Sequence, residues 1–362
     1  MNNQSVEKNV QVVPASKRRS CLGCLGRGAI ILAGLLVVLL IAGAIYQDAA
    51  SASDLKKYPA TGKLYDIGDY NLCLTCTGQG SPTVILEAGG GLPGLLWIFV
   101  QEEIEKSARV CSYDRAGIGW SEPASGPLSP QQIASDLHSL LKTAGVPGPY
   151  ALVGHSAGGV YVRAYASQYS SEVVGMVLVD SSHEGQNIQY PPEYQKLDRF
   201  QNSMIAFCRV VSPFGVMRLS RIYDATIAGL SMNPEIEAAY LSTVYRTRSC
   251  RVLAQEIEAL STIYNKSDTP SSLGDLPLIV LTADTSEAEM QAQVPAYLRS
   301  TVGPEVIAKV FQVNREMQKD LAGLSSRGRQ VMVSDTRHMI QLDQPGVVID
   351  AIRDVIAQVR GE

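Results

Sequence analysis

The sequence predicts an α/β protein with a mostly parallel sheet, a helical insertion and an N-terminal membrane-spanning helix. Short apolar runs bounded by glycine or proline alternate with helical stretches, which is typical of a parallel sheet covered by helices. Residues from about 185 to 273 interrupt this alternation with helix formers and no convincing strand pattern. The run 28–47 carries no charged residue at all.

Composition narrows the function classes. The 362 residues carry 31 Lys and Arg against 35 Asp and Glu, with no basic stripe, which excludes a generic nucleic-acid binder. The length fits two or three domains, or one large α/β domain with an insertion. Four histidines, His138, His155, His183 and His338, show no close pairing, so we expect no zinc site.

The N-terminal 57 residues form a separate unit. Residues 1–27 are basic, and the 20 residues of 28–47 would span about 30 Å as a helix, the thickness of a bilayer core. We favour an uncleaved anchor over a cleaved signal peptide, because the apolar core of a signal peptide is usually about 7–15 residues long. The alternative stays open, because residues 50–52 read Ala-Ser-Ala, a pattern that a signal peptidase can cleave. The charge asymmetry places 1–27 in the cytoplasm and 58–362 outside the cell membrane, after a polar linker at 48–57. Cleavage would make the protein secreted.

The cysteines leave several pairings open. Cys21 and Cys24 form a lone C-x-x-C beside the apolar run and are interpreted as small interfacial residues or acylation sites. An odd number of cysteines follows in the predicted exported part: Cys73, Cys76, Cys111, Cys208 and Cys250. Cys208 and Cys250 share a helical stretch and are the favoured pair, but spacing does not determine the connectivity.

Eight strands are expected from the apolar and alternating runs. In chain order they are 62–67, 70–77, 82–88, 108–113, 150–154, 173–179, 276–282 and 330–334. Gly68-Asp69 predicts a hairpin between the first two. Helices are expected around 102–106, from Ser129, after 158 and over 346–359, since apolar residues recur there at helical spacing.

The motif with the clearest chemistry is Gly154-His155-Ser156-Ala157-Gly158, followed by Gly159. It matches G-x-S-x-G between an apolar strand and an apolar helix, where a nucleophile elbow lies. The elbow needs small flanking residues because strand and helix nearly collide. The alternative is an ordinary strand-to-helix turn with an idle serine.

A serine nucleophile needs a base, and the chain order of this arrangement puts the base after the last strand. His338 follows the last predicted strand. We expect His155 to point elsewhere on the turn.

Two carboxylates compete to orient that histidine. Asp180 ends the strand 173–179, and Asp284 follows the strand 276–282. Both lie at carboxyl ends of strands, where active sites of open α/β sheets gather. The usual acid position after the later strand falls on Ser286, so we favour Asp180 and keep Asp284 as the alternative.

The oxyanion of an acyl-transfer reaction needs two N–H donors. We expect them from Ala157 and from Gly90 in the glycine loop after the third strand, although such a loop can also be a plain flexible turn. The same loop, Gly89 to Gly94, literally matches G-x-G-x-x-G, with Asp114 20 residues after Gly94. An NAD(P)-dependent oxidoreductase is therefore a rival function, and a catalytically silent binding module is a third. Pro93-Gly94 is a poor helix start for a pyrophosphate site.

From about Tyr58 to Glu362 the chain resembles the α/β-hydrolase fold superfamily, in particular its membrane-anchored or secreted microbial serine hydrolases. The matching stretches are VILEAGGG, SYDRAGIGWSEP, YALVGHSAGG, VLVDSSHEG and RHMIQLDQP. The resemblance implies an eight-stranded sheet with a helical cap after strand six, at about 183–274. It also implies Ser156 as nucleophile, His338 as base, and Gly90 and Ala157 as oxyanion donors.

The resemblance further implies an acid at the end of strand six in some members, where Asp180 stands. Asp114 and Arg115 match a D-R-x-G-x-G loop that shapes the site wall, and we interpret them as structural. Members with an aspartate nucleophile, such as epoxide hydrolases and haloalkane dehalogenases, differ at the position of Ser156. The expected substrate is a small acyl compound, an ester, thioester, lactone or amide selected by the cap, with no cofactor. No motif predicts an oligomeric state.

Overall fold

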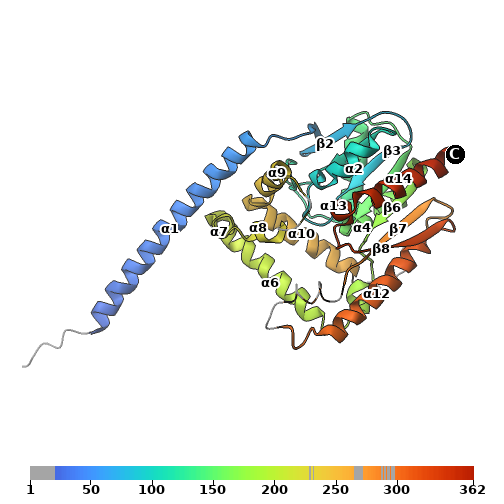
Figure 1. Cartoon of the computed structure of the whole chain (residues 1–362). Helices are drawn as coiled ribbons and strands as arrows, with labels where there is room; N and C mark the ends of the chain where they lie inside the picture. Colours follow the sequence, from blue (N-terminus) through green and yellow to red (C-terminus); the bar gives the residue numbers. More distant parts are fainter. Residues whose placement is uncertain are drawn as a thin grey trace, which may run out of the picture.

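The computed structural model describes residues 21–227, 230, 232–264, 272–286, 288, 291, 294 and 298–362. Most of the basic segment 1–27 and part of the cap therefore lie outside the described residues. One eight-stranded sheet organises the rest, with strand order β1-β2-β4-β3-β5-β6-β7-β8 (Figure 1). β1 and β2 form the antiparallel hairpin, β2 pairs antiparallel with β4, and all later pairs are parallel.

All eight predicted strands form, which confirms the fold class. Their bounds are β1 Lys63–Asp66, β2 Asn71–Thr77, β3 Thr83–Glu87, β4 Val110–Tyr113, β5 Tyr150–His155, β6 Val173–Val179, β7 Leu278–Asp284 and β8 Gly328–Ser334. β7 extends further than expected, so Asp284 is its last residue rather than part of the following loop. The reason is continued pairing, because β7 stays in register with β8 up to Asp284 and Ser334.

Helices cover both faces of the sheet. Their bounds are α2 Ile98–Ile104, α3 Pro130–Thr143, α4 Ala157–Gln168, α12 Pro304–Ala322, α13 Ile340–Asp343 and α14 Pro345–Arg360. Apolar residues of α3, α4 and α12 form one core with the sheet, and those of α2 and α14 form a second core. Figure 1 shows α2 and α14 side by side. The strand ends are thus held between two packed layers, and this fixes where their loops emerge.

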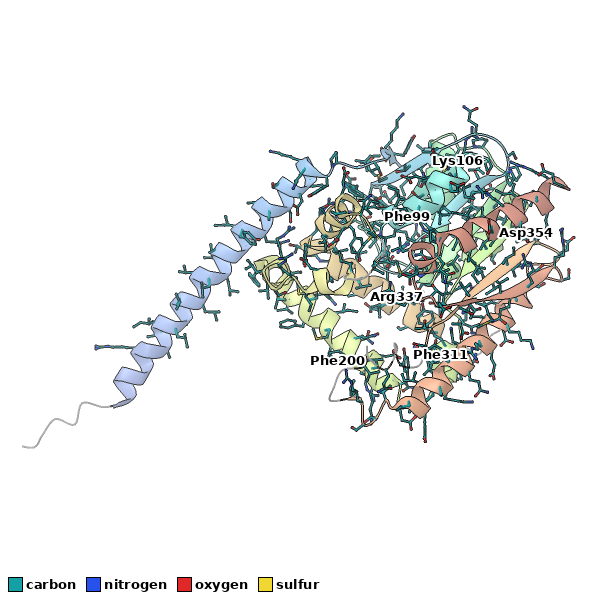
Figure 2. The ribbon with its side chains drawn as sticks, in the orientation of Figure 1. Phe99, Lys106, Phe200, Phe311, Arg337 and Asp354 are labelled. Carbon is teal, nitrogen blue, oxygen red and sulfur yellow. A yellow bond between two sulfur atoms is a disulfide. The ribbon has the colours of Figure 1, made fainter. Side chains whose placement is uncertain are left out.

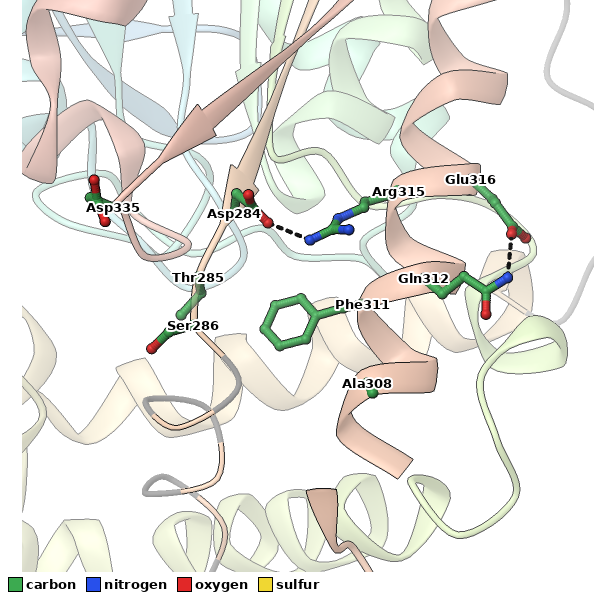
Figure 3. A pocket seen from close by; sticks show the side chains of 9 residues that line it. All are labelled: Asp284, Thr285, Ser286, Ala308, Phe311, Gln312, Arg315, Glu316 and Asp335. Carbon is green, nitrogen blue, oxygen red and sulfur yellow. Dashed lines mark hydrogen bonds and ion pairs between the residues drawn. The ribbon is translucent and has the colours of Figure 1, made fainter. Parts of the chain in front are cut away.

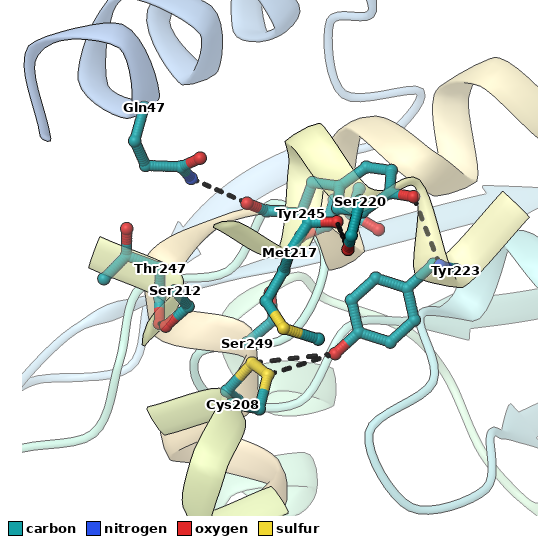
Figure 4. The surroundings of a disulfide bond; sticks show 11 residues. Gln47, Cys208, Ser212, Met217, Ser220, Tyr223, Tyr245, Thr247 and Ser249 are labelled. Atoms are coloured by element: carbon teal, nitrogen blue, oxygen red, sulfur yellow. Dashed lines mark hydrogen bonds between the residues drawn. A yellow bond between two sulfur atoms is a disulfide. The ribbon is translucent and has the colours of Figure 1, made fainter. Parts of the chain in front are cut away.

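The insertion between β6 and β7 is helical, as expected. It contains α5 Gln186–Gln189, α6 Gln195–Val211, α7 Val216–Ser220, α8 Ile222–Ile227, α9 Pro234–Val244 and α10 Thr247–Tyr264, with the 3₁₀ turn η3 Ser212–Phe214. The favoured Cys208–Cys250 disulfide joins α6 to α10, beside Tyr223 (Figure 4). A second disulfide, Cys76–Cys111, joins the neighbouring strands β2 and β4, and Cys73 is free and buried.

Helix α1 spans Cys21–Lys57 and contains the whole uncharged run. Residues 48–57, predicted as a linker, continue this helix, because three alanines and a leucine favour it and no glycine or proline occurs between Gln47 and Pro59. Among the described residues α1 is the one helix long and apolar enough to cross a membrane. Its apolar side chains stand clear of the body, with Ile30 73% exposed (Figure 2).

Candidate active site

The G-x-S-x-G turn joins β5 directly to α4. Ser156 lies at the junction with φ +52° and ψ −123°, a strained conformation for a residue with a side chain. A Cβ at Gly154 would lie 2.7 Å from the Gly158 carbonyl oxygen, and one at Gly158 would lie 2.6 Å from the Ala88 carbonyl oxygen. The two glycines are thus needed for the close approach of strand and helix, as the sequence predicts.

His338 and Asp180 are brought together from positions 158 residues apart. His338 follows β8, and its Nδ1 lies 2.6 Å from Oδ2 of Asp180, which follows β6. The other Asp180 oxygen, Oδ1, accepts the Ala283 N–H at 3.1 Å, which holds the carboxylate in place. Burial lowers the pKa of His338, but the hydrogen bond and the charge of Asp180 outweigh this and raise it above its ordinary value.

The alternative acid, Asp284, is engaged elsewhere. Its Oδ1 accepts from Nη2 of Arg315 on α12 at 2.5 Å, inside a hollow of about 790 Å³ (Figure 3). This hollow is lined neither by Ser156 nor by His338. Ser286 is exposed at the start of the following loop. The geometry therefore pairs Asp180, and not Asp284, with the histidine.

The two expected oxyanion donors also lie together. A Cβ built on Gly90 would be 3.7 Å from Cβ of Ala157. The next residue, Gly91, has a φ of +68° and donates its N–H to Oε2 of Glu256 at 2.5 Å. The glycine loop is thus tied to a carboxylate from the cap.

Glu256, on α10, is a residue that sequence reasoning missed. Its Oε1 accepts the Nε–H of Arg115 at 2.7 Å, and both side chains are fully buried. Arg115 also donates to Glu87 at 2.6 Å and to the carbonyl oxygen of Gly89 at 2.6 Å. With two buried carboxylates around one arginine, burial raises the pKa of Glu87 to about 7, while Arg115 opposes the shift. No motif marks Glu256, because its partners lie more than 140 residues away.

His155, which was expected to point elsewhere on the turn, makes a contact with His338 that sequence reasoning did not predict. Its ring centroid lies 4.7 Å from that of His338, and its Nε2 lies 3.0 Å from the His338 carbonyl oxygen. Since a carbonyl only accepts, Nε2 must carry the hydrogen. Complete burial, followed by the proximity of His338, lowers the pKa of His155 well below its ordinary value, so it stays neutral. The position of His155 next to Ser156 in the motif is the sequence feature that could have indicated this contact.

The glycine loop does not have the geometry of a dinucleotide site. Gly94 opens a 3₁₀ turn, η1 Gly94–Trp97, instead of an α-helix, and its N–H donates to Oδ1 of Asp114 at 2.8 Å. Asp114 is buried and also accepts the Trp120 N–H at 2.9 Å, so it is not free for a ribose hydroxyl. Nothing in this loop supports the oxidoreductase interpretation.

Aromatic residues of the cap approach the same region. The rings of Tyr190 and Tyr194 lie 5.1 Å apart in an edge-to-face arrangement. Burial raises the pKa of Tyr190, and the nearby charges of Tyr194 and then Asp180 add to the shift.

Comparison with known proteins identifies relatives across most of the chain. It is 25% identical over 310 residues to a probable transporter of Hormonema carpetanum, covering 82% of this chain and 42% of that protein. It is 23% identical over 302 residues to an AB hydrolase superfamily protein of Gibberella zeae, covering 77% and 87%. An uncharacterized vacuolar membrane protein of Saccharomyces cerevisiae is 32% identical over 133 residues, 32% of this chain and 21% of that protein. The chain spans less than half the length of the first curated relatives it matches.

Solved structures share the fold at low identity. A candidate lipase of Acinetobacter baumannii matches with a TM-score of 0.63, 19% identity and coverage of 87% of this chain and 97% of that chain. A thermophilic esterase of Thermogutta terrifontis has a TM-score of 0.55, 20% identity and coverage of 83% and 99%. The family described as alpha/beta hydrolase fold matches residues 82–288, more than half of the sequence. The chain therefore belongs to the α/β-hydrolase fold family.

Proposed function

We propose that this α/β-hydrolase cleaves an ester or a related acyl bond, with Ser156 as nucleophile, His338 as base and Asp180 as the orienting acid. The observation that carries the proposal is the 2.6 Å contact between His338 Nδ1 and Asp180. It leaves Nε2 of the same ring to take a proton, and the strained turn at Ser156 favours an accessible hydroxyl.

In this reaction the Ser156 hydroxyl attacks the acyl carbon while its proton moves to Nε2 of His338. Asp180 accepts the Nδ1–H throughout, which holds the tautomer and stabilises the imidazolium. The backbone N–H groups of Gly90 and Ala157 donate to the oxyanion of the tetrahedral intermediate. The imidazolium then protonates the leaving group, and water, deprotonated by His338, hydrolyses the acyl-enzyme.

Serine at the elbow argues against the epoxide-opening and dehalogenating members of the family, which use aspartate there. Thioesters, lactones and amides are processed by the same machinery as esters. A screen of p-nitrophenyl acyl esters of increasing chain length identifies the preferred acyl group.

The test combines labelling and kinetics. The full chain should react covalently with a fluorophosphonate probe, and Ser156→Ala should abolish the reaction. Asp180→Asn should lower kcat by roughly 10⁴-fold with KM largely kept, whereas Asp284→Asn should stay within about an order of magnitude of the parent.

Each failure has a distinct meaning. A large loss of kcat in Asp284→Asn, together with a nearly unchanged kcat in Asp180→Asn, would assign the acid role to Asp284. Unchanged labelling of Ser156→Ala would refute the nucleophile. An unlabelled chain that binds a nicotinamide cofactor would revive the oxidoreductase, and one that binds acyl compounds without turnover would indicate a silent module.

We also propose that α1 anchors the enzyme with its N-terminus in the cytoplasm and the catalytic domain outside. Basic residues before the apolar run support this orientation. The two disulfides fit an oxidising compartment. Protease added to intact cells should remove the catalytic domain. Its survival there, with loss only after lysis, would reverse the orientation, and a mature N-terminus after residue 52 would make the protein secreted.

A further inference from the structure

The cap exposes several apolar side chains along one stretch of chain, residues 204–222. The residues of this surface, called the apolar cap face below, are Met204, Phe207, Val210, Val216, Leu219 and Ile222. Val210 and Leu219 are 67% and 65% exposed, values that leave most of each side chain without protein contact. Clusters of this kind on a soluble surface mark an interaction site.

Helix α6 carries the first three of these residues. Met204, Phe207 and Val210 recur every three residues and so lie on one side of the helix. Cys208, four residues after Met204, borders this side; it is buried and bonded to Cys250 of α10. The helix is thus fixed to the cap through Cys208 and leaves Phe207 and Val210 more than half exposed.

The apolar cap face lies next to the proposed membrane anchor. The α1 helix touches η3 so closely that Gly43 leaves no room for a side chain against the Phe214 carbonyl group. Gln47 donates its Nε2–H to the Tyr245 carbonyl oxygen at 2.7 Å (Figure 4), and Asp54 pairs with Arg218 at 2.6 Å. These contacts lie at Gln47 and on either side of it, where the uncharged run ends and the proposed anchor would leave the bilayer core. Figure 1 shows α6 extending from this contact crosswise to α1.

The charge of the segment fits the same surface. Residues 199–223 contain four arginines and no acidic residue. Of these, Arg199 and Arg209 are exposed on α6, whereas Arg218 pairs with Asp54 and Arg221 pairs with Asp224, the residue after this range. A basic rim around an apolar strip is typical of helices that lie in the headgroup region of anionic membranes.

We propose that the apolar cap face docks on the outer surface of the lipid bilayer that α1 spans, with α6 lying in the headgroup region. This proposal rests on the proposed anchor. A bilayer is favoured over a protein partner because the contacts at Gly43, Gln47 and Asp54 already hold this face at the end of the membrane-spanning run. The cap is then seated on lipid.

The test uses the full chain in vesicles of phosphatidylcholine and phosphatidylglycerol, with and without brominated acyl chains. Bromine quenches a tryptophan that lies within the bilayer. The parent chain, whose Trp97 and Trp120 are buried, supplies the background emission. Phe207→Trp reports the apolar cap face, Val37→Trp reports the anchor, and Met332→Trp, exposed on the edge strand β8, is the control.

Phe207→Trp should lose emission in brominated vesicles and shift to the blue, as Val37→Trp should, while Met332→Trp should not. Unquenched Phe207→Trp beside quenched Val37→Trp overturns the docking and leaves the face to a second copy or a protein partner. Unquenched Val37→Trp overturns the anchor and the docking together. Fluorophosphonate labelling of the same samples reports the catalytic proposal independently.

Discussion

Replacing Glu256 with glutamine tests whether the cap positions the glycine loop. One carboxylate oxygen accepts the Gly91 N–H at 2.5 Å and the other accepts the Arg115 Nε–H at 2.7 Å, both in the buried interior. A glutamine keeps one acceptor and places an NH₂ group against the other donor. Either Gly91 or Arg115 then loses its acceptor.

The cost follows from these contacts. Losing a hydrogen bond to a charged group costs about 1.5–3 kcal/mol. Breaking a buried ion pair costs about 3–5 kcal/mol. Because Arg115 keeps its ion pair with Glu87, we expect the cost of losing Glu256 to be at most about 3 kcal/mol. We expect Glu256→Gln to lower the free energy of unfolding by about 2–3 kcal/mol.

The catalytic effect is separate from this loss of stability. Removing one oxyanion donor costs about 10²–10³ in kcat, and a displaced Gly90 N–H should cost less, about 10- to 100-fold. KM should change little, because the donor acts on the transition state. The assays are urea unfolding followed by circular dichroism and steady-state hydrolysis of a p-nitrophenyl ester.

The matched control is Glu258→Gln, two residues along the same helix, where the side chain is exposed. It should change stability by no more than about 0.5 kcal/mol. If Glu256→Gln loses stability but keeps kcat, Glu256 only supports the fold and the positioning role is refuted. If it matches Glu258→Gln in both assays, the buried network carries neither function.

Three further predictions concern the histidines and the elbow. Because Asp180 raises the pKa of His338, kcat/KM should be high above this pKa and should fall as the pH drops through it, at a pH above the usual histidine value of about 6.5. Asp180→Asn should move this fall to lower pH. An unchanged pH profile in Asp180→Asn would contradict the pairing of Asp180 with His338. His155→Phe keeps a ring but removes the donor to the His338 carbonyl oxygen, so kcat should drop roughly tenfold with KM kept, and an unchanged kcat would refute the positioning role. Gly158→Ala places a Cβ 2.6 Å from backbone oxygens and should abolish fluorophosphonate labelling, whereas Gly346→Ala, with open space around it, should label as the parent does.

Local sequence was sufficient to predict the strands, the turn at Ser156 and the choice of His338 as the candidate base. Alternating runs around Gly68-Asp69 marked the first two strands, and short apolar runs marked the other six, because a buried strand needs continuous apolar residues. The Ser156 turn was predictable because strand, turn and helix are adjacent in the chain, and small residues are the requirement of that turn. His338 followed from chain order alone.

Other features depended on tertiary structure. Asp180 follows β6 and Asp284 ends β7, both at the carboxyl ends of parallel strands, and only the fold shows that Asp180 contacts His338 whereas Asp284 contacts Arg315. The direction of a side chain at a strand end depends on register, and β7 ran further in register with β8 than its composition indicated.

Contacts between segments that are distant in the chain could not be predicted from the sequence either, because they depend on how the elements pack. Glu256 reaches Gly91 across 165 positions, and Gln47 reaches Tyr245 across 198. No local pattern encodes such pairs, since each partner alone is an ordinary helix or loop residue. The sequence by itself determined the order of the elements, the turn at Ser156 and the uncharged helical run of α1. The tertiary structure decided which carboxylate meets the histidine, what holds the glycine loop, and which face of the cap lies beside the anchor, because these depend on how packed layers bring remote backbone segments together.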